Sequence, residues 1–457
     1  MKTDRKIGKR SVAHFYRHPL IQCMSPYLGC LRGMADPVAV REVQWTPLAA
    51  STAAVLLALT GHCPLRVGCQ DVLMCMGGSC CRSEQARVGT SYNGLIKALE
   101  RQSSAVLPLV KASLRRHAAG AFEHLPRVHG WTLLAVDGSR IGLPRTRDHE
   151  ASFGMSDNGH YPQAYLTAVM EVHTGLLWDW RIDRADASEQ HHLQAMTAGL
   201  PRKALLLADA HFVGYPIWSE LVAQGTPFVI RVGGNVHLLT KLWPEVDFEH
   251  HGGCADRIVY AWPKPRQRDC PPLRLRLIRL GSRSDPVYLL TNVLDTAKLS
   301  RPAVGMIYRL RWGAEMFYRT FKRTLEHVKL KSRVGRRSRL ELEWGLIGMC
   351  IMTLLGIDAL IKRRRNPVAL SPAGLMHTLR AALLRAPVTP GLQTPKQLSK
   401  ALSCAVRDGY TRRSSKKSRH RPLTVNTPRL RLHPPKLRPA TPEERALALR
   451  RYPAMAA

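Results

Sequence analysis

The sequence predicts an α/β fold in which helices flank a mixed sheet, with a helical region before the sheet and a β-rich region inserted in it. Two short apolar runs that each stop at an aspartate, WTLLAVDG and ALLLADAHF, are typical of central strands covered on both faces. Residues 225–294 hold short alternating or β-branched runs separated by Gly, Pro and Asp, which indicates mostly antiparallel strands. Apolar residues recur at intervals of three and four in residues 41–125, which indicates helices.

The N-terminal region divides into two parts. Residues 1 to about 40 are basic without clear periodicity and predict an arm, whereas residues 41–125 predict a small helical domain. That domain is suited either to recognition of DNA ends or to a plain packing role.

Asp137 and Asp209 close the two apolar runs. A buried strand that ends in Asp-Gly places its carboxylate at the edge of the sheet, so we expect both aspartates to end neighbouring strands beside a cleft. For either residue alone, a helix cap or a turn is the alternative role. Between them, YLTAVMEVH and LLWDWRID flank a turn at Thr174-Gly175 and predict a hairpin, and SEQHHLQAMTAGL follows with helical spacing.

The run LRLRLIRL in the β-rich region alternates Leu or Ile with Arg. One face of such a strand goes to the core, and the other presents Arg274, Arg276 and Arg279. We expect these arginines either on a solvated face or against DNA.

A third acid lies in residues 305–339, which are rich in Arg, Lys, Glu, Leu and Met and have neither Pro nor Gly between positions 314 and 334. This composition predicts a helix. Four of its side chains fall within an arc of about 60° and form one stripe: Tyr308, Arg311, Glu315 and Lys322. A lone carboxylate among such neighbours is suited to hold a metal ion while they hold phosphates, and a solvated helix face is the alternative.

The charge balance favours a polyanionic partner. Lys and Arg number 69 against 33 Asp and Glu, for a formal net charge of +36. Such a field recommends nucleic acid over acidic metabolites, and the length and nine Trp argue against a ribosomal or structural nucleoid protein. Residues 411–440 are rich in Lys, Arg and Pro and lack acids, so we expect a disordered basic arm that attracts phosphates regardless of sequence.

The sequence contains few features that indicate a cellular compartment or a zinc site. The basic start lacks the apolar core of a signal peptide, so we expect a cytoplasmic, nucleoid-associated protein with reduced thiols. Five of the 11 Cys lie in residues 63–81 without a CxxC pair, which favours packing and turn roles over a zinc site. The apolar residues 345–361 enclose Asp358 and predict a buried core helix, not a membrane span.

The spacing Tyr-x2-Arg-x3-Glu-x6-Lys resembles the YREK signature of DDE transposases from bacterial insertion sequences, in insertion sequence family four. The resemblance implies a ribonuclease H-like sheet over about residues 131–360, with a glutamate on a helix beyond the β insertion. The catalytic and metal-binding acids that it implies are Asp137 in VDGS, Asp209 in ADAH and Glu315 in YRLRWGAE. The DNA-binding residues that it implies are Tyr308, Arg311 and Lys322, with Arg319 and Trp312 as further contacts.

Three carboxylates suit the chemistry that this resemblance implies. Phosphodiesters resist attack because the phosphate is already negative, and two divalent cations about 3.5–4 Å apart activate the attacking oxygen and stabilise the leaving one. Carboxylates are the ligands that Mg²⁺ prefers, and we expect two Mg²⁺ ions, with Mn²⁺ able to substitute. His211 is expected to be a neighbour of Asp209 and not a ligand, and Trp312 either stacks a displaced base or anchors the core.

The implied function is cut-and-paste DNA transposition, in which hydrolysis at the transposon ends precedes attack of the freed 3′-hydroxyl on target DNA. The expected partner is double-stranded DNA, as terminal inverted repeats and as target, and a homodimer is expected because two ends are held at once. A nuclease that does not join ends and a domesticated DNA-binding protein without chemistry are the alternatives.

These elements predict six segments along the chain. They are a basic arm with a helical domain (1–126), the first part of the catalytic domain (127–224), the β-rich insertion (225–300), the last part of the catalytic domain with the YREK helix (301–365), a helical C-terminal segment (366–410) and a basic tail (411–457).

Overall fold

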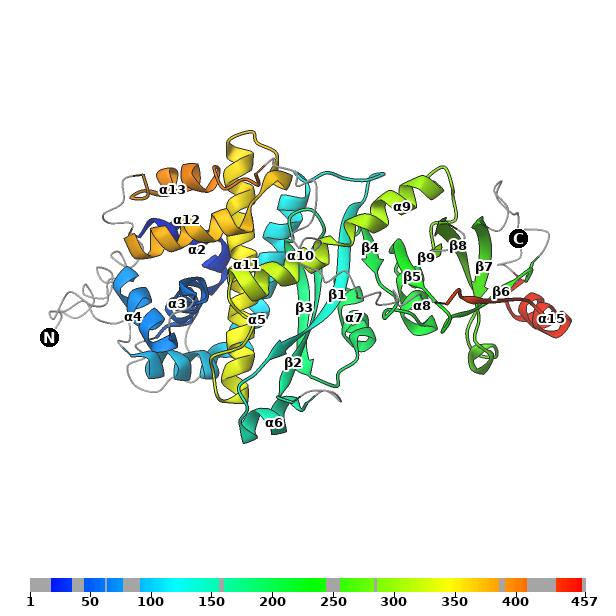
Figure 1. Ribbon diagram of the computed structural model, residues 1–457, viewed down its shortest axis with the longest axis horizontal. Helices are drawn as coiled ribbons and strands as arrows, with labels where there is room; N and C mark the ends of the chain where they lie inside the picture. Colours follow the sequence, from blue (N-terminus) through cyan, green and yellow to red (C-terminus); the bar gives the residue numbers. More distant parts are fainter. Residues whose placement is uncertain are drawn as a thin grey trace, which may run out of the picture. The chain divides into compact units, whose positions relative to one another are not determined.

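The computed structural model describes most of the chain, in nine stretches (Figure 1). These are residues 18–34, 45–61, 64–76, 91–155, 160–243, 255–282, 286–385, 391–408 and 433–453. They belong to two compact units. The first unit comprises Met1–Arg127, Leu134–His192 and Arg311–Val406, and the second comprises Val128–Leu133, Leu193–Leu310 and Arg407–Ala457.

One long helix, α11 (Gly335–Lys362), is the centre of the helical part of the first unit (Figure 1). The other helices of this part are α2 (Pro19–Leu28), α3 (Pro47–Thr60), α4 (Leu65–Cys75), α5 (Tyr92–Phe122), α12 (Pro372–Arg385) and α13 (Pro395–Leu402). Among the described residues α11 is the one helix long and apolar enough to cross a membrane, but 89% of its most apolar window is buried in the protein. The prediction of a core helix over residues 345–361 is therefore confirmed.

Helix α2 corrects the prediction of an arm over residues 1–40. Leu20 and Met24 are buried, and the hydroxyl of Tyr27 donates a hydrogen bond to the carboxylate of Asp358 on α11 at 2.7 Å. The basic residues that suggested an arm lie mostly before position 18, outside the described residues, and the segment after them is apolar enough to join the core.

The first unit also contains an antiparallel sheet of β1 (Thr132–Gly142), β2 (Gln163–Glu171) and β3 (Leu177–Arg184), with α6 (Arg147–Phe153) between β1 and β2. The predicted hairpin of β2 and β3 is confirmed. Its turn includes Gly175 with a φ of +70°, a conformation that favours glycine. The buried carboxylate of Glu171 holds this turn, because it accepts hydrogen bonds from the backbone N–H and the hydroxyl of Thr174.

The second unit contains a mixed sheet in the order β10-β6-β7-β8-β9-β5-β4. Its strands are β4 (Ala204–Ala208), β5 (Phe228–Val232), β6 (His237–Thr240), β7 (Asp256–Ala261), β8 (Leu273–Gly281), β9 (Pro286–Thr291) and β10 (Lys436–Pro439). β4 pairs with β5 and β10 with β6 in parallel, while the pairs from β6 through β9 to β5 are antiparallel. The α/β class, the mixed sheet and the mainly antiparallel β-rich region are therefore confirmed.

Helices accompany this sheet, and the start of β1 joins the second unit. The helices are α7 (Glu189–Thr197), whose last residues lie in this unit, α8 (Tyr215–Ala223) and α9 (Arg301–Leu310). The backbone N–H of Thr132, at the start of β1, donates to the carbonyl of Lys203 at 2.8 Å.

Strand β8 corrects the expectation that Arg276 faces solvent or DNA. The Arg276 side chain is fully buried, and its Nε donates to the Asp256 carboxylate at 2.7 Å while its Nη1 donates to the carbonyl of Leu299 at 2.6 Å. Both faces of β8 are covered at this point. Arg276 therefore forms a buried ion pair with Asp256 and does not point to solvent. Arg274 and Arg279 remain partly exposed, as expected for the outer face.

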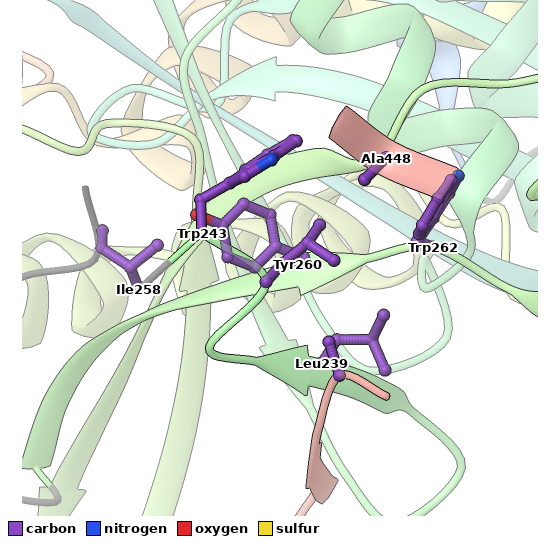
Figure 2. Packing of buried hydrophobic residues seen from close by; sticks show 8 residues of the cluster. Leu239, Trp243, Ile258, Tyr260, Trp262 and Ala448 are labelled. Atoms are coloured by element: carbon purple, nitrogen blue, oxygen red, sulfur yellow. The ribbon is translucent and has the colours of Figure 1, made fainter. Parts of the chain in front are cut away.

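The end of the chain corrects the prediction of a disordered tail. Residues 409–432 lie outside the described part, but Lys436–Pro439 form the edge strand β10 and Pro442–Arg451 form α15. Figure 2 shows Ala448 of α15 beside Trp262, in a cluster that also includes Leu239 and Tyr260. These few apolar residues pack the C-terminal segment against a face of the sheet. The composition of the segment does not reveal this contact, because the sheet face is formed by strands far away in the sequence.

The described cysteines of the 63–81 group pack inside the first unit. Cys69 is buried on α4, and burial raises the pKa of Cys75 on the same helix to about 12. A protonated thiol in an apolar setting is the packing role that the sequence favours. Cys63, Cys80 and Cys81 lie outside the described residues.

A buried histidine within residues 305–339 makes stability depend on pH. His327 stacks on Phe321 with ring centroids 4.7 Å apart, and burial, with a smaller effect of Lys331, lowers its pKa to about 4. The unfolded chain therefore takes up a proton near pH 6.5 that the folded chain refuses. Between pH 6.5 and 4 we expect the free energy of unfolding to fall by roughly 3 kcal/mol from this residue, because 1.36 kcal/mol accompanies each pKa unit.

Thermal unfolding across this pH range measures the effect. His327→Phe is expected to remove this part of the pH dependence, whereas the control His124→Gln, which changes an exposed histidine, is expected to retain it. An unchanged pH profile in His327→Phe would contradict the assignment.

Candidate functional site

Asp137 lies within β1 and not at its end, which corrects the predicted strand boundary. β1 runs on through Gly138 to Gly142, because β2 pairs with it along the whole stretch, and Asp137 stands opposite Ala168. The strand becomes partly exposed at Asp137. Val136 is fully buried, whereas the Asp137 side chain is 19% exposed. One carboxylate oxygen accepts the backbone N–H of Gly138 at 2.9 Å, and the other faces Arg311.

The third-acid segment is not one helix, so the predicted single stripe of four side chains is wrong. α9 ends at Leu310, a turn follows at residues 311–312, and α10 spans Gly313–Arg319. The break has a packing cause. A Cβ at Gly313 would stand 2.2 Å from the carbonyl oxygen of Val172, so glycine is needed for this close approach of α10 to the end of β2.

The break separates the signature residues between the two units. Tyr308 lies on α9 in the second unit, half-buried. The first unit contains Arg311, Trp312, Glu315, Arg319 and Lys322.

Arg311 and Asp137 face each other in the first unit. The Arg311 Nη1 lies 3.9 Å from the Asp137 Oδ2, and the two side chains are 18% and 19% exposed. A guanidinium at this distance stabilises the charged carboxylate, and its planar array of N–H groups has the geometry that matches phosphate oxygens. Arg311, a cation suited to bind phosphate, and Asp137, a carboxylate suited to bind a metal ion, therefore lie side by side.

Tyr318 fastens α10 to the strand that carries Asp137. Its hydroxyl donates to the main-chain oxygen of Asp137 at 2.7 Å, and its ring is buried. Burial raises the pKa of Tyr318 well above its usual value, and the charges of Asp137 and Glu189 add to this effect, so the hydroxyl stays a donor. Glu315 lies one turn before Tyr318 on the same short helix and is exposed. This anchor fixes the backbone that presents Glu315 relative to β1.

Lys322 lies in a π-helical turn, Thr320–Thr324, that continues α10. Its ammonium donates to the hydroxyl of Ser139 on β1 at 2.7 Å, and burial lowers its pKa. Ser139 is two residues beyond Asp137, so Lys322 and Arg311 bracket the aspartate from the same segment. Such π-helical turns occur often at functional sites.

Trp312 and Arg319 lie on the outside of this segment. The Trp312 side chain is 61% exposed, which excludes the alternative of a core anchor, and Arg319 is exposed as well. The core is instead reached by Phe317 and Tyr318 on the other face of α10. An exposed indole remains free to stack on another ring.

Glu189 is an acid beside Asp137 that sequence reasoning missed. It stands in the first turn of α7, and a Cβ added at Gly138 would meet its carboxylate oxygen at 2.6 Å. The sequence does show an acid at the start of the helix that follows the hairpin. An acid in the first turn of a helix is ordinarily explained by its favourable interaction with the helix dipole, so this position gave no sign of a functional site.

Asp209 follows β4 in the second unit, as predicted. Its Oδ1 accepts the backbone N–H of His211 at 2.9 Å, and its Oδ2 lies 3.2 Å from the His211 Nδ1. The Asp209 side chain is 24% exposed and that of His211 is 78% exposed. His211 thus lies within reach of the Asp209 carboxylate, and both side chains offer atoms that could bind a metal ion.

The chain is similar to known transposases. Residues 130–352 match the family model described as "Transposase DDE domain". Transposase InsG for insertion sequence element IS4, from Escherichia coli (strain K12), is 24% identical over 270 residues, which cover 56% of this chain and 58% of that relative. A solved structure, the piggyBac transposase synaptic complex with hairpin DNA, shares 12% identity with a TM-score of 0.42 and covers 89% of both chains. Residues 130–352 of this chain therefore resemble a transposase DDE domain, and the chain is similar to a transposase of insertion sequence IS4.

Proposed function

We propose that this protein cuts DNA at the ends of a mobile element and joins those ends to target DNA. The observation that carries the proposal is the approach of Arg311 to Asp137 at 3.9 Å inside a transposase DDE domain. It supports the proposal because a cation suited to phosphate stands next to an acid suited to a metal ion. The formal net charge of +36 adds long-range attraction for the DNA polyanion.

Asp137, Asp209 and Glu315 are the proposed catalytic acids. A DDE domain implies dependence on a divalent metal ion, and we assign Mg²⁺, two ions with Mn²⁺ able to substitute. The donor set fits this ion, because all three acids offer hard oxygen ligands and none is sealed from solvent. Bound ions would activate the attacking oxygen and stabilise the leaving one. The proposal requires the three acids to share the metal ions when DNA is bound.

The cations and the aromatic residues of the segment position the DNA. Arg311 can donate to two oxygens of one phosphate, since its planar fork matches that geometry, and Lys322 contributes a point charge held by Ser139. Trp312 is placed to stack a displaced base, and Arg319 and Tyr308 add contacts to the DNA backbone. Because two ends must be held at once, the active species is a homodimer on double-stranded DNA.

Lys322→Met tests the phosphate contact. We expect weaker binding to DNA that carries the element's ends, with a salt slope reduced by about one, because one phosphate contact is lost. Ser139→Ala is the matched control: it keeps the cation and removes only its hydrogen-bond partner, so a smaller loss is expected. Equal affinity and equal slope in Lys322→Met and the unaltered protein would refute the contact.

The proposed activity is tested with purified protein, Mg²⁺ and a duplex that ends in the inverted repeats flanking the gene. We expect nicking at the repeat boundary, transfer of the 3′ end into a second duplex, and loss of both on chelation of the metal. Cleavage without joining would identify a nuclease instead. Tight DNA binding without metal-dependent cleavage would overturn the catalytic proposal.

A further inference from the structure

A cavity of about 580 Å³ opens in the first unit, and its lining includes none of the three proposed catalytic acids. It lies between α2, the C-terminal end of α11 and the start of α13, which pack together (Figure 1). The charged side chains that line it are Lys362, Arg363, Lys396 and Asp358. The cavity is therefore a mainly cationic hollow in the helical part of the chain.

The lining contains one carboxylate, that of Asp358. Asp358 accepts the hydroxyl of Tyr27 at 2.7 Å. Within the described part of the chain, none of the three cations has an ion-pair partner, and all three are exposed. Three cations against one carboxylate leave the lining with a net positive charge, so a bound anion would stabilise this arrangement.

Helix electrostatics explain part of this cluster but not all of it. Lys362 ends α11, where a cation complements the negative end of the helix. Lys396 is the second residue of α13, at the positive end of a helix whose capping box is complete between Thr394 and Gln397. A lysine there is unfavourable for the helix itself, which points to an external anion as its partner.

The shape and the lining indicate which anion. The volume exceeds what one small ion needs, and the cationic run continues past the cavity with the exposed Arg364. Tyr27, the aromatic residue of the lining, is only 2% exposed and offers no face on which a base could stack. Repeated phosphates fit this lining better than bases do.

We propose that this cavity is a second DNA-binding site, which takes phosphates of duplex DNA outside the cleaved bond. The inference rests on the proposed function in so far as DNA is the substrate, but it does not depend on the chemistry of the acids. Such contacts position the duplex and carry no sequence information.

The test removes the three cations together, as Lys362→Gln, Arg363→Gln and Lys396→Gln in the full chain. The probe is a 40-bp duplex without the inverted repeats, and its Kd is measured against KCl concentration in EDTA. We expect the slope of log Kd against log salt to fall by roughly 2 to 3, since each lost phosphate contact removes about 0.9. The matched control removes three exposed cations elsewhere in the unit, as Lys97→Gln, Arg116→Gln and Arg147→Gln, and should change the slope by less than about one.

Each outcome decides the proposal. A slope that is unchanged in the cavity variant, or changed equally in the control, overturns it, provided that thermal unfolding shows both variants folded. Loss of binding to phosphatidylglycerol vesicles with unchanged DNA binding assigns the cavity to a membrane surface and also overturns it. Because EDTA prevents metal-dependent cleavage, a reduced slope supports the cavity site even if the unaltered protein fails to cut DNA.

Discussion

Replacing Asp137 by Asn is expected to lower the rate of strand cleavage by roughly 10³-fold, because a carboxylate that holds a divalent ion supports several kcal/mol of transition-state stabilisation. The substitution keeps the size of the side chain and the hydrogen bond from the Gly138 N–H. Affinity for the DNA ends should be retained or rise slightly, since a negative charge next to the phosphates is lost. Cleavage of end-labelled DNA under single-turnover conditions measures the effect.

The same loss is expected for Asp209→Asn and for Glu315→Gln, each measured separately. Glu123→Gln is the control, because that acid is 65% exposed and pairs with Arg127 just after α5. It should leave the cleavage rate within about threefold, well below the 10³-fold loss. A variant of Asp137, Asp209 or Glu315 with full activity would remove that residue from the catalytic set.

Breaking the buried ion pair of the second unit is expected to give the largest change in stability. Asp256→Asn leaves the Arg276 guanidinium fully buried with a neutral partner, and such changes cost about 3–5 kcal/mol. Urea unfolding followed by tryptophan fluorescence measures the loss, since Trp262 is close to the same strand pair.

Two further variants separate the charge effect from packing. Arg279→Gln changes a partly exposed arginine on the same strand and should cost less than about 0.5 kcal/mol. The double change Arg276→Met with Asp256→Leu replaces the pair by apolar side chains and should be far less destabilising than Asp256→Asn alone. An Asp256→Asn midpoint equal to that of the unaltered chain would contradict the pair's role.

Local patterns were sufficient where local interactions decide structure. The hairpin of β2 and β3 follows from two apolar runs around Thr174-Gly175, and α11 follows from an uninterrupted apolar segment. Asp209 was placed correctly after its strand because five consecutive apolar residues bound β4 without ambiguity. In each case the period of the side chains and the turn residues lie within one stretch of chain.

Contacts between distant segments decided the rest. Helical spacing put Tyr308 and Lys322 on one stripe, but Val172 approaches the backbone at Gly313 and the helix breaks there. The burial of Arg276 depends on Asp256, which is twenty residues earlier in the chain. The order of the C-terminal segment depends on a sheet face built from residues 237–261.

The sequence by itself determined the fold class and the cationic character of this protein and predicted its catalytic acids, because periodicity, composition and fixed spacing are properties of the chain. Only the tertiary structure decided that Arg311 faces Asp137, that Lys322 bonds Ser139 and that Glu189 lies beside the strand. The physical reason is that a side chain's charge is fixed by its chemistry, whereas its burial and its partners are fixed by whatever the folded chain packs against it.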